Sequence, residues 1–167
     1  SAEMARETRK AAGLTQTQLG LETNYTREAI SKHETGERSV SAERANHMTS
    51  KYNDPRLAIE TAHEYKGWGL GWLDGEALDT HRLAAVALAK KEMMDALEAI
   101  DEALLAKQPK FIKEFERGQI EDMLLESAEA VAFLEFKIAK LCQVYHFNFE
   151  DIFKTTETRL RAERLVK

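Results

Sequence analysis

Apolar residues recur with helical spacing along most of the chain, and no run alternates apolar and polar residues as a half-buried strand does. In the first part, the apolar patterns are short and are separated by turn signals. Thr15 and Gln18 have the spacing of a capping box, which predicts a helix start at Gln16. Asn24 suits a sharp turn, because asparagine tolerates positive φ. These signals predict short helices over about residues 2–12, 16–23, 27–35, 42–52 and 56–65.

The second half contains two long patterns in which apolar residues recur in alternating steps of three and four. The first covers about residues 79–107 and ends at Pro109, and the second runs to about Tyr145. Sustained heptads predict helices that pack along a seam. Between them, a short amphipathic piece over residues 111–117 is expected to stop at Gly118. The seam positions are Leu83, Val86, Lys90, Met93, Leu97, Ile100 and Leu104 in the first helix and Ile120, Leu124, Ser127, Val131, Leu134, Ile138, Leu141 and Tyr145 in the second.

The second long helix carries another apolar set, made of Ala132, Phe133, Phe136 and Ala139, on a different face. One antiparallel hairpin covers both faces poorly. A third helix over residues 148–166 is expected to cover part of the remainder, and a second subunit the rest.

The predicted fold class is therefore all-α, with a five-helix domain over residues 1–65 and a helical hairpin or bundle over residues 79–167. Residues 66–78 form a connector rich in glycine, with Trp68 and Trp72. A phosphate-binding loop is disfavoured there, because no strand precedes it and no G-x-G-x-x-G is present. We expect the two tryptophans to dock between the domains.

The stretch LTQTQLGLETNYTREAISKHETGER resembles the helix-turn-helix of the XRE, or lambda-repressor-like, family, which implies that the first domain is a DNA-binding unit. Three positions depart from the family pattern: Asn24 replaces the usual glycine, Gly20 replaces alanine at some cost in helix stability, and Tyr25 replaces a smaller apolar residue. The matching residues are Leu14, Thr15, Gln16, Leu19, Thr26, Ile30, Ser31, Glu34, Gly36 and Arg38.

The resemblance implies that the helix following Thr26 enters the major groove. Arg27, Glu28 and Lys32 then occupy base-facing positions, with Ser31 between them. Arginine and lysine can donate to guanine, and glutamate can accept from cytosine. A solvated helix face is the plainer alternative for these side chains.

The same resemblance assigns contacts to the DNA backbone and within the domain. Gln16 and Thr26 are expected to bind phosphate. Arg9 and Glu34 match a family ion pair that ties the first helix to the end of the recognition helix.

Charge changes this picture in one respect. The net charge is −5, and neither part of the chain on either side of Tyr65 is basic overall. A DNA-binding domain usually carries a basic face, so binding would depend on the local placement of charge.

The sequence does not demand an enzyme, a metal or a cofactor. The five histidines are scattered, and the acidic residues near Glu116 suit a solvated helix start. The single cysteine, Cys142, cannot form an internal disulfide, which favours a reducing cytoplasm. No apolar run is long enough for a membrane span, and no signal peptide is visible.

The sequence thus predicts a cytoplasmic transcriptional regulator of bacterial or prophage type. It would bind double-stranded DNA as a homodimer through its C-terminal helices and repress by occupying a palindromic operator. One alternative is an antitoxin-type autoregulator whose second half binds a toxin. Another is a protein–protein adaptor whose helix-turn-helix does not bind DNA, which the acidic charge favours. A monomeric second domain and a further protein partner also remain open.

Overall fold

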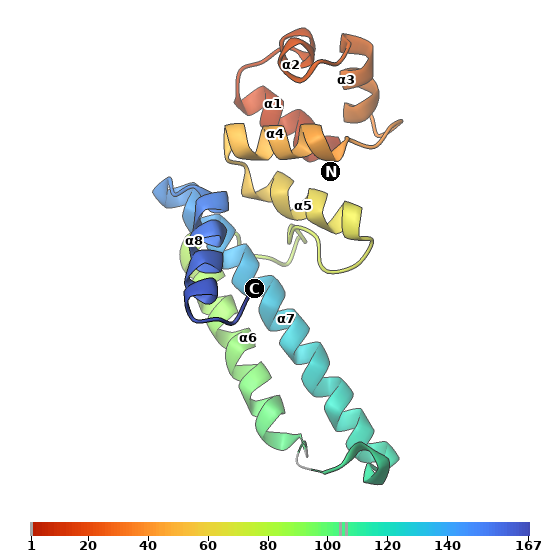
Figure 1. Ribbon diagram of the computed structural model, residues 1–167, viewed down its shortest axis with the longest axis vertical. Helices are drawn as coiled ribbons and strands as arrows, with labels where there is room; N and C mark the ends of the chain where they lie inside the picture. The colour runs from red at the N-terminus through yellow and green to blue at the C-terminus, as the bar shows by residue number, and fades with distance from the viewer. Residues whose placement is uncertain (1, 104, 106) are drawn as a thin grey trace. The chain divides into compact units, whose positions relative to one another are not determined.

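The computed structural model describes residues 2–103, 105 and 107–167, and across these ranges the fold is all-α, as predicted. The chain divides into two compact units (Figure 1). One contains the residues up to 72 together with residues 145–167, and the other contains residues 73–144. None of the described helices is both long and apolar enough to cross a membrane.

The first unit contains the predicted series of five short helices and one helix from the end of the chain. Leu19 of the second helix and Ile30 of the third are almost completely buried in its core, with Ala5, Val40, Ala45, Met48 and Leu57. The helices are α1 (Ala2–Ala11), α2 (Gln16–Thr23), α3 (Arg27–Glu34), α4 (Ala42–Tyr52), α5 (Pro55–Lys66) and α8 (Phe149–Ala162).

The start of α2 and the turn that follows this helix are formed by residues that the sequence analysis singled out. Thr15 and Gln18 form the predicted capping box, and Asn24 has a left-handed φ of 60°. Gly20, which the sequence analysis treated only as a cost in helix stability, is required by the close packing of this turn. A Cβ atom at Gly20 would lie 2.5 Å from the backbone oxygen of Tyr25, so the turn passes where a side chain would stand.

Helix α8 is held to the end of α4 by Asn53. This residue ends α4 with a φ of 48°. Its side-chain amide donates to the backbone oxygen of Phe147 at 3.0 Å and accepts from the backbone N–H of Phe149 at 2.9 Å. Ser50 of α4 also donates to Glu150 at 2.7 Å. Residues 145–167 therefore group with the first unit, whereas the sequence analysis placed them in a domain over residues 79–167.

The second unit is an antiparallel pair of long helices, α6 (Arg82–Glu102) and α7 (Glu114–Tyr145), joined through a short 3-10 turn, η1 (Pro109–Phe111) (Figure 1). The expected stop at Gly118 is wrong, because α7 begins at Glu114 and continues through the glycine. The carboxylate of Glu116 accepts from the backbone N–H of Lys113 at 2.7 Å, which stabilises the helix start. A glycine costs about 1 kcal/mol inside a helix, which a long helix tolerates.

The predicted seam of large apolar residues is wrong for α6. Its buried positions are Ala85, Ala89, Glu92 and Ala96, while Leu83 and Leu97 of the predicted seam are 65% and 61% exposed. In α7, Ala132, Phe136 and Ala139 of the other predicted set are buried, whereas Leu124, Val131 and Tyr145 of the seam are exposed. Each long helix carries two overlapping stripes of apolar residues, and only one of them can face the interior. In α6, the buried stripe is the one that contains the alanines. Leu104 of the predicted seam lies outside the described residues.

In the connector, Trp68 is 71% exposed and lies beside the ammonium group of Lys66. The expected docking of the tryptophans between the domains stays a prediction. Trp72 is half-buried, and its backbone N–H donates to the Glu60 carboxylate at 2.6 Å.

Candidate nucleic-acid interface

Helix α3 has a buried face and an outer face. Ile30, His33 and Glu34 are buried against the rest of the first unit. The N-terminus of α3 is capped by Thr26, whose hydroxyl oxygen accepts from the backbone N–H of Ala29 at 3.2 Å. The cap fixes where the helix begins, and therefore which side chains its first turn presents to the outside.

The predicted base-facing residues lie together on the outer face of α3. Arg27, Glu28 and Lys32 are exposed, and Ser31 between them is half-buried. Among the described residues, none of the three charged side chains forms an ion pair. The guanidinium, carboxylate and ammonium groups are therefore available to bind groups outside the protein.

The two predicted phosphate-binding residues begin α2 and α3. Gln16 is half-buried, and its side-chain N–H donates to Glu34 at 3.0 Å. This bond leaves a second N–H of the amide and its oxygen available. The Thr26 hydroxyl accepts in its cap and keeps its own O–H for donation. Donors at two helix N-termini suit an anion such as phosphate.

Arg9 and Glu34 form the predicted ion pair. Arg9 Nε donates to Glu34 Oε1 at 2.6 Å, and Nη2 donates to Oε2 at 2.9 Å. A further N–H of Arg9 donates to the backbone oxygen of Leu14 at 2.6 Å. Burial acts to raise the pKa of Glu34, but the hydrogen bonds from Arg9 and Gln16 outweigh it, so the pKa lies below its ordinary value. The pair therefore ties α1 to the end of α3 and orients Gln16.

The sequence analysis missed a second buried polar group behind α3. Arg44 of α4 is 1% exposed, is hydrogen-bonded to His33 Nδ1, and lies over the ring of Tyr25. The Tyr25 ring in turn meets the His33 ring edge-on, with centroids 5.6 Å apart. Burial lowers the pKa of His33, and the charges of Arg44 and Arg38 lower it further. The inward spacing of Arg44 with Met48 on α4 is the signal that could have revealed it.

An acidic group in the second unit also escaped the sequence analysis. Oxygen atoms of Glu92, Asp95 and Glu126 lie within 4.8 Å of one another, between α6 and α7. Lys91 donates to Asp95 at 2.7 Å and to Glu92 at 3.1 Å, and these bonds raise the pKa of Lys91 above its usual value. The lysine therefore already supplies positive charge to this group.

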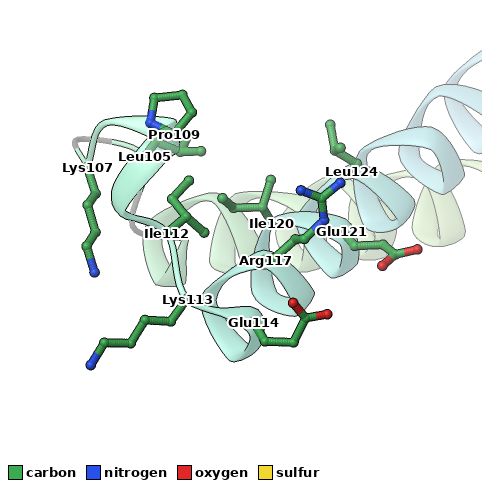
Figure 2. A pocket seen from close by; sticks show the side chains of 10 residues that line it. All are labelled: Leu105, Lys107, Pro109, Ile112, Lys113, Glu114, Arg117, Ile120, Glu121 and Leu124. Atoms are coloured by element: carbon green, nitrogen blue, oxygen red, sulfur yellow. The ribbon is translucent and has the colours of Figure 1, made fainter.

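A hollow of about 710 Å³ lies at the turn between α6 and α7. Figure 2 shows Ile112 and Ile120 at its centre and Lys113 reaching away from it. The ammonium of Lys107 donates to both carboxylate oxygens of Glu116 at 2.8 Å, so it is engaged within the turn. The lining residues are Leu105, Lys107, Pro109, Ile112, Lys113, Glu114, Arg117, Ile120, Glu121 and Leu124.

Comparison with known proteins bears on the first unit. No curated protein and no solved structure gave a significant match to the chain. A protein-family model with the description Helix-turn-helix matches residues 6–49, which cover α2, α3 and most of α1 and α4. Residues 6–49 are therefore a helix-turn-helix domain of the XRE, lambda-repressor-like kind, a domain found in DNA-binding transcriptional regulators.

Proposed function

We propose that this protein is a sequence-specific transcriptional regulator that reads double-stranded DNA with α3. The observation that carries the proposal is the outer face of α3, where Arg27, Glu28 and Lys32 are exposed and form no ion pair among the described residues. This face belongs to a helix-turn-helix domain. In helix-turn-helix motifs generally, the second of the two paired helices, which is α3 in this chain, lies in the major groove.

The side chains of this face match the chemistry of base edges. Arg27 can donate twice to guanine O6 and N7, and Lys32 can donate to the same atoms. Glu28 can accept from the N4 amino group of cytosine, and Ser31 can bind either a donor or an acceptor. Glu28 also repels phosphate, so it lowers the affinity for DNA of arbitrary sequence while keeping a preference among bases.

Gln16 and Thr26 would fix the position of α3 on the DNA backbone. Contacts to phosphate carry no sequence information, but they set the register and orientation of the protein. The hydrogen bond from Gln16 to Glu34, and the paired bonds from Arg9 to Glu34, orient the first of these contacts before DNA arrives.

The regulator would act in the cytoplasm as a homodimer that represses by occupying a palindromic operator, as in bacterial or prophage regulators. Two recognition helices related by a two-fold axis read half-sites about one helical turn apart. Occupancy of the promoter blocks polymerase without any catalytic step.

A protein-binding role is the second candidate. The net charge of −5 and the exposed apolar residues of α6 favour a protein partner, either a toxin or another regulator. In that case the helix-turn-helix would be an adaptor.

Selection of bound fragments from random and genomic DNA tests the proposal. We expect wild type to enrich a palindrome with half-sites about ten base pairs apart at near-physiological salt, and Arg27→Ala/Lys32→Ala to enrich nothing. Lys110→Ala/Lys113→Ala removes two lysines from the second unit, and we expect it to enrich the same palindrome as wild type. A folded wild-type protein that enriches no sequence contradicts the proposal and favours the adaptor.

A further inference from the structure

Helix α6 has an apolar face that the described residues of its own unit leave uncovered. The carboxylate of Glu92 lies close to that of Glu126 on α7, so the buried side of α6 faces α7. At about 100° of rotation per residue, six apolar residues of α6 point about 80–180° away from the direction of Glu92, and we call these residues the α6 outer face. It consists of Leu83, Val86, Met93, Met94, Leu97 and Ile100, all of which are exposed.

Two opposite charges, Lys90 and Asp101, lie near the middle of the α6 outer face, and further charged residues of α6, Arg82, Lys91, Glu98 and Glu102, lie toward its edges. Lys90 and Asp101 both point about 160–180° away from Glu92 and are separated by about three helical turns. Both are exposed, and among the described residues neither forms an ion pair. A partner that covers this face must therefore supply a carboxylate near Lys90 and a cation near Asp101, because covering an unpaired charge is costly.

We propose that the occupant of the α6 outer face is the same face of a second copy of this chain, in antiparallel orientation. A two-fold axis that crosses the outer face midway between Lys90 and Asp101, at the height of residues 95 and 96 along the helix, places each Lys90 against Asp101 of the second copy. The same axis brings Met94 opposite Leu97 of the second copy. One helix thus satisfies both charges and covers the apolar residues between them.

The charges exclude the parallel arrangement. Parallel pairing would place Lys90 against Lys90 and Asp101 against Asp101, and like charges in contact are strongly unfavourable. The apolar side chains, which extend over about 26 Å of helix from Leu83 to Ile100, would supply the affinity. The two ion pairs would determine the orientation, as charged pairs beside an apolar seam do in coiled coils.

This inference deepens the proposed function, because it names the surface that would join two DNA-reading units. Its test uses the full chain without DNA. A failure of α6 pairing is therefore seen separately from a failure of DNA reading.

Cysteine cross-linking tests the orientation. In the antiparallel pair, the two copies of residue 94 lie about 5 Å apart along the helix axis, and those of residue 83 about 38 Å apart. We expect a short bis-maleimide to cross-link Met94→Cys and to leave Leu83→Cys and the wild type monomeric on a denaturing gel. Cys142, at 4% exposed, is buried in the wild type. Equal cross-linking of Met94→Cys and Leu83→Cys, or none of Met94→Cys, overturns the proposal.

Charge reversal tests the ion pairs by sedimentation equilibrium. We expect Lys90→Glu and Asp101→Lys each to raise the dimer Kd by about tenfold or more, and the double variant to restore it. Glu102→Lys, which reverses a charge beside the face, is the control and should leave the dimer Kd unchanged. A monomeric wild type, or single variants that dimerise like the wild type, overturns the proposal. Circular dichroism confirms that each variant keeps its helices.

Discussion

Glu34 at the end of α3 accepts two parallel hydrogen bonds from Arg9 of α1, at 2.6 and 2.9 Å. Their side chains are only 4% and 10% exposed. A third bond, from Gln16, reaches the same carboxylate at 3.0 Å. One buried carboxylate thus connects the first three helices of the DNA-binding domain.

We expect Glu34→Gln to lower the free energy of unfolding by about 3–5 kcal/mol, because it leaves the buried Arg9 guanidinium without a counter-charge. The double variant Arg9→Met/Glu34→Gln removes both charges and should recover part of the loss. Chemical denaturation followed by circular dichroism measures both. If the loss of stability in the double variant equals the sum of the losses in Arg9→Met and Glu34→Gln alone, the two residues are not coupled.

The buried His33 predicts a loss of stability in mild acid. Its folded pKa lies below its ordinary value of 6.5 because of burial and the charges of Arg44 and Arg38. Protonation therefore favours the unfolded chain, so the His33 contribution is complete above about pH 6.5 and is lost as pH falls toward the folded pKa. Glu34, whose pKa lies below its ordinary value of 4.5, contributes stability that is complete above about pH 4.5 and is lost only as pH falls below that value.

Denaturation midpoints between about pH 7 and pH 5 check this expectation. His33→Gln cannot take up the proton, so its stability should depend less on pH in that window than the stability of the wild type. If the variant loses stability in parallel with wild type, another group is responsible.

Two glycine substitutions should act in opposite directions. Gly20→Ala should destabilise α2, because its Cβ would stand 2.5 Å from the Tyr25 backbone oxygen and overpacking costs about 1–3 kcal/mol. Gly118→Ala should stabilise α7 by up to about 1 kcal/mol, since nothing lies within 4 Å of its Cβ. Hydrogen exchange of each helix measures the two effects. Increased protection of α2 in Gly20→Ala would contradict the close approach.

Asn53 should control the attachment of α8. Asn53→Gly keeps the left-handed backbone but removes the bonds to Phe147 and Phe149, so the start of α8 should exchange faster while α4 stays protected. Asn53→Ala should also fray the end of α4, at a cost of about 1 kcal/mol.

Asn24→Gly provides the matched control for Asn53→Gly, because Asn24 is also left-handed but ends α2 rather than α4. Hydrogen exchange should show α8 unchanged in this variant. Unchanged exchange of α8 in Asn53→Gly would show that its side chain does not hold the helix.

DNA binding should separate base readers from phosphate anchors. We expect Arg27→Ala to cost about 1–3 kcal/mol for the preferred sequence and much less for unrelated DNA. Gln16→Ala should weaken both by a similar factor, because a phosphate contact carries no sequence information. Titrations of both DNAs at fixed salt distinguish these outcomes. Thr17→Ala, on the exposed side of α2, is the control.

Local signals were enough to predict much of the first unit. The capping box at Thr15, the left-handed Asn24 and the cap at Thr26 each depend on neighbouring residues, so their chemistry is visible in a short stretch. The Arg9–Glu34 pair was predicted only through the resemblance, because the partners lie far apart in sequence. The roles of the six predicted DNA-binding residues stay predictions.

The second unit was harder to predict because periodicity does not say which of two stripes is buried. The heptad pattern of α6 predicts that its large apolar residues are buried, but Ala85, Ala89 and Ala96 are buried instead. Burial of Arg44 was missed because an arginine is rarely fully buried. Its contacts with His33 and Tyr25 explain the burial, and these contacts are visible only in the structure.

The hydrogen bond between Gln16 and Glu34 affects when entropy is lost. Fixing a long side chain costs up to about 1.5–2 kcal/mol of rotamer freedom. For Gln16, that loss occurs when the domain folds, so a phosphate that meets this amide encounters a side chain that is already ordered. A loose glutamine at the same position would have to lose its freedom at each encounter with DNA. The buried carboxylate of Glu34 thus moves an entropic penalty from recognition to folding.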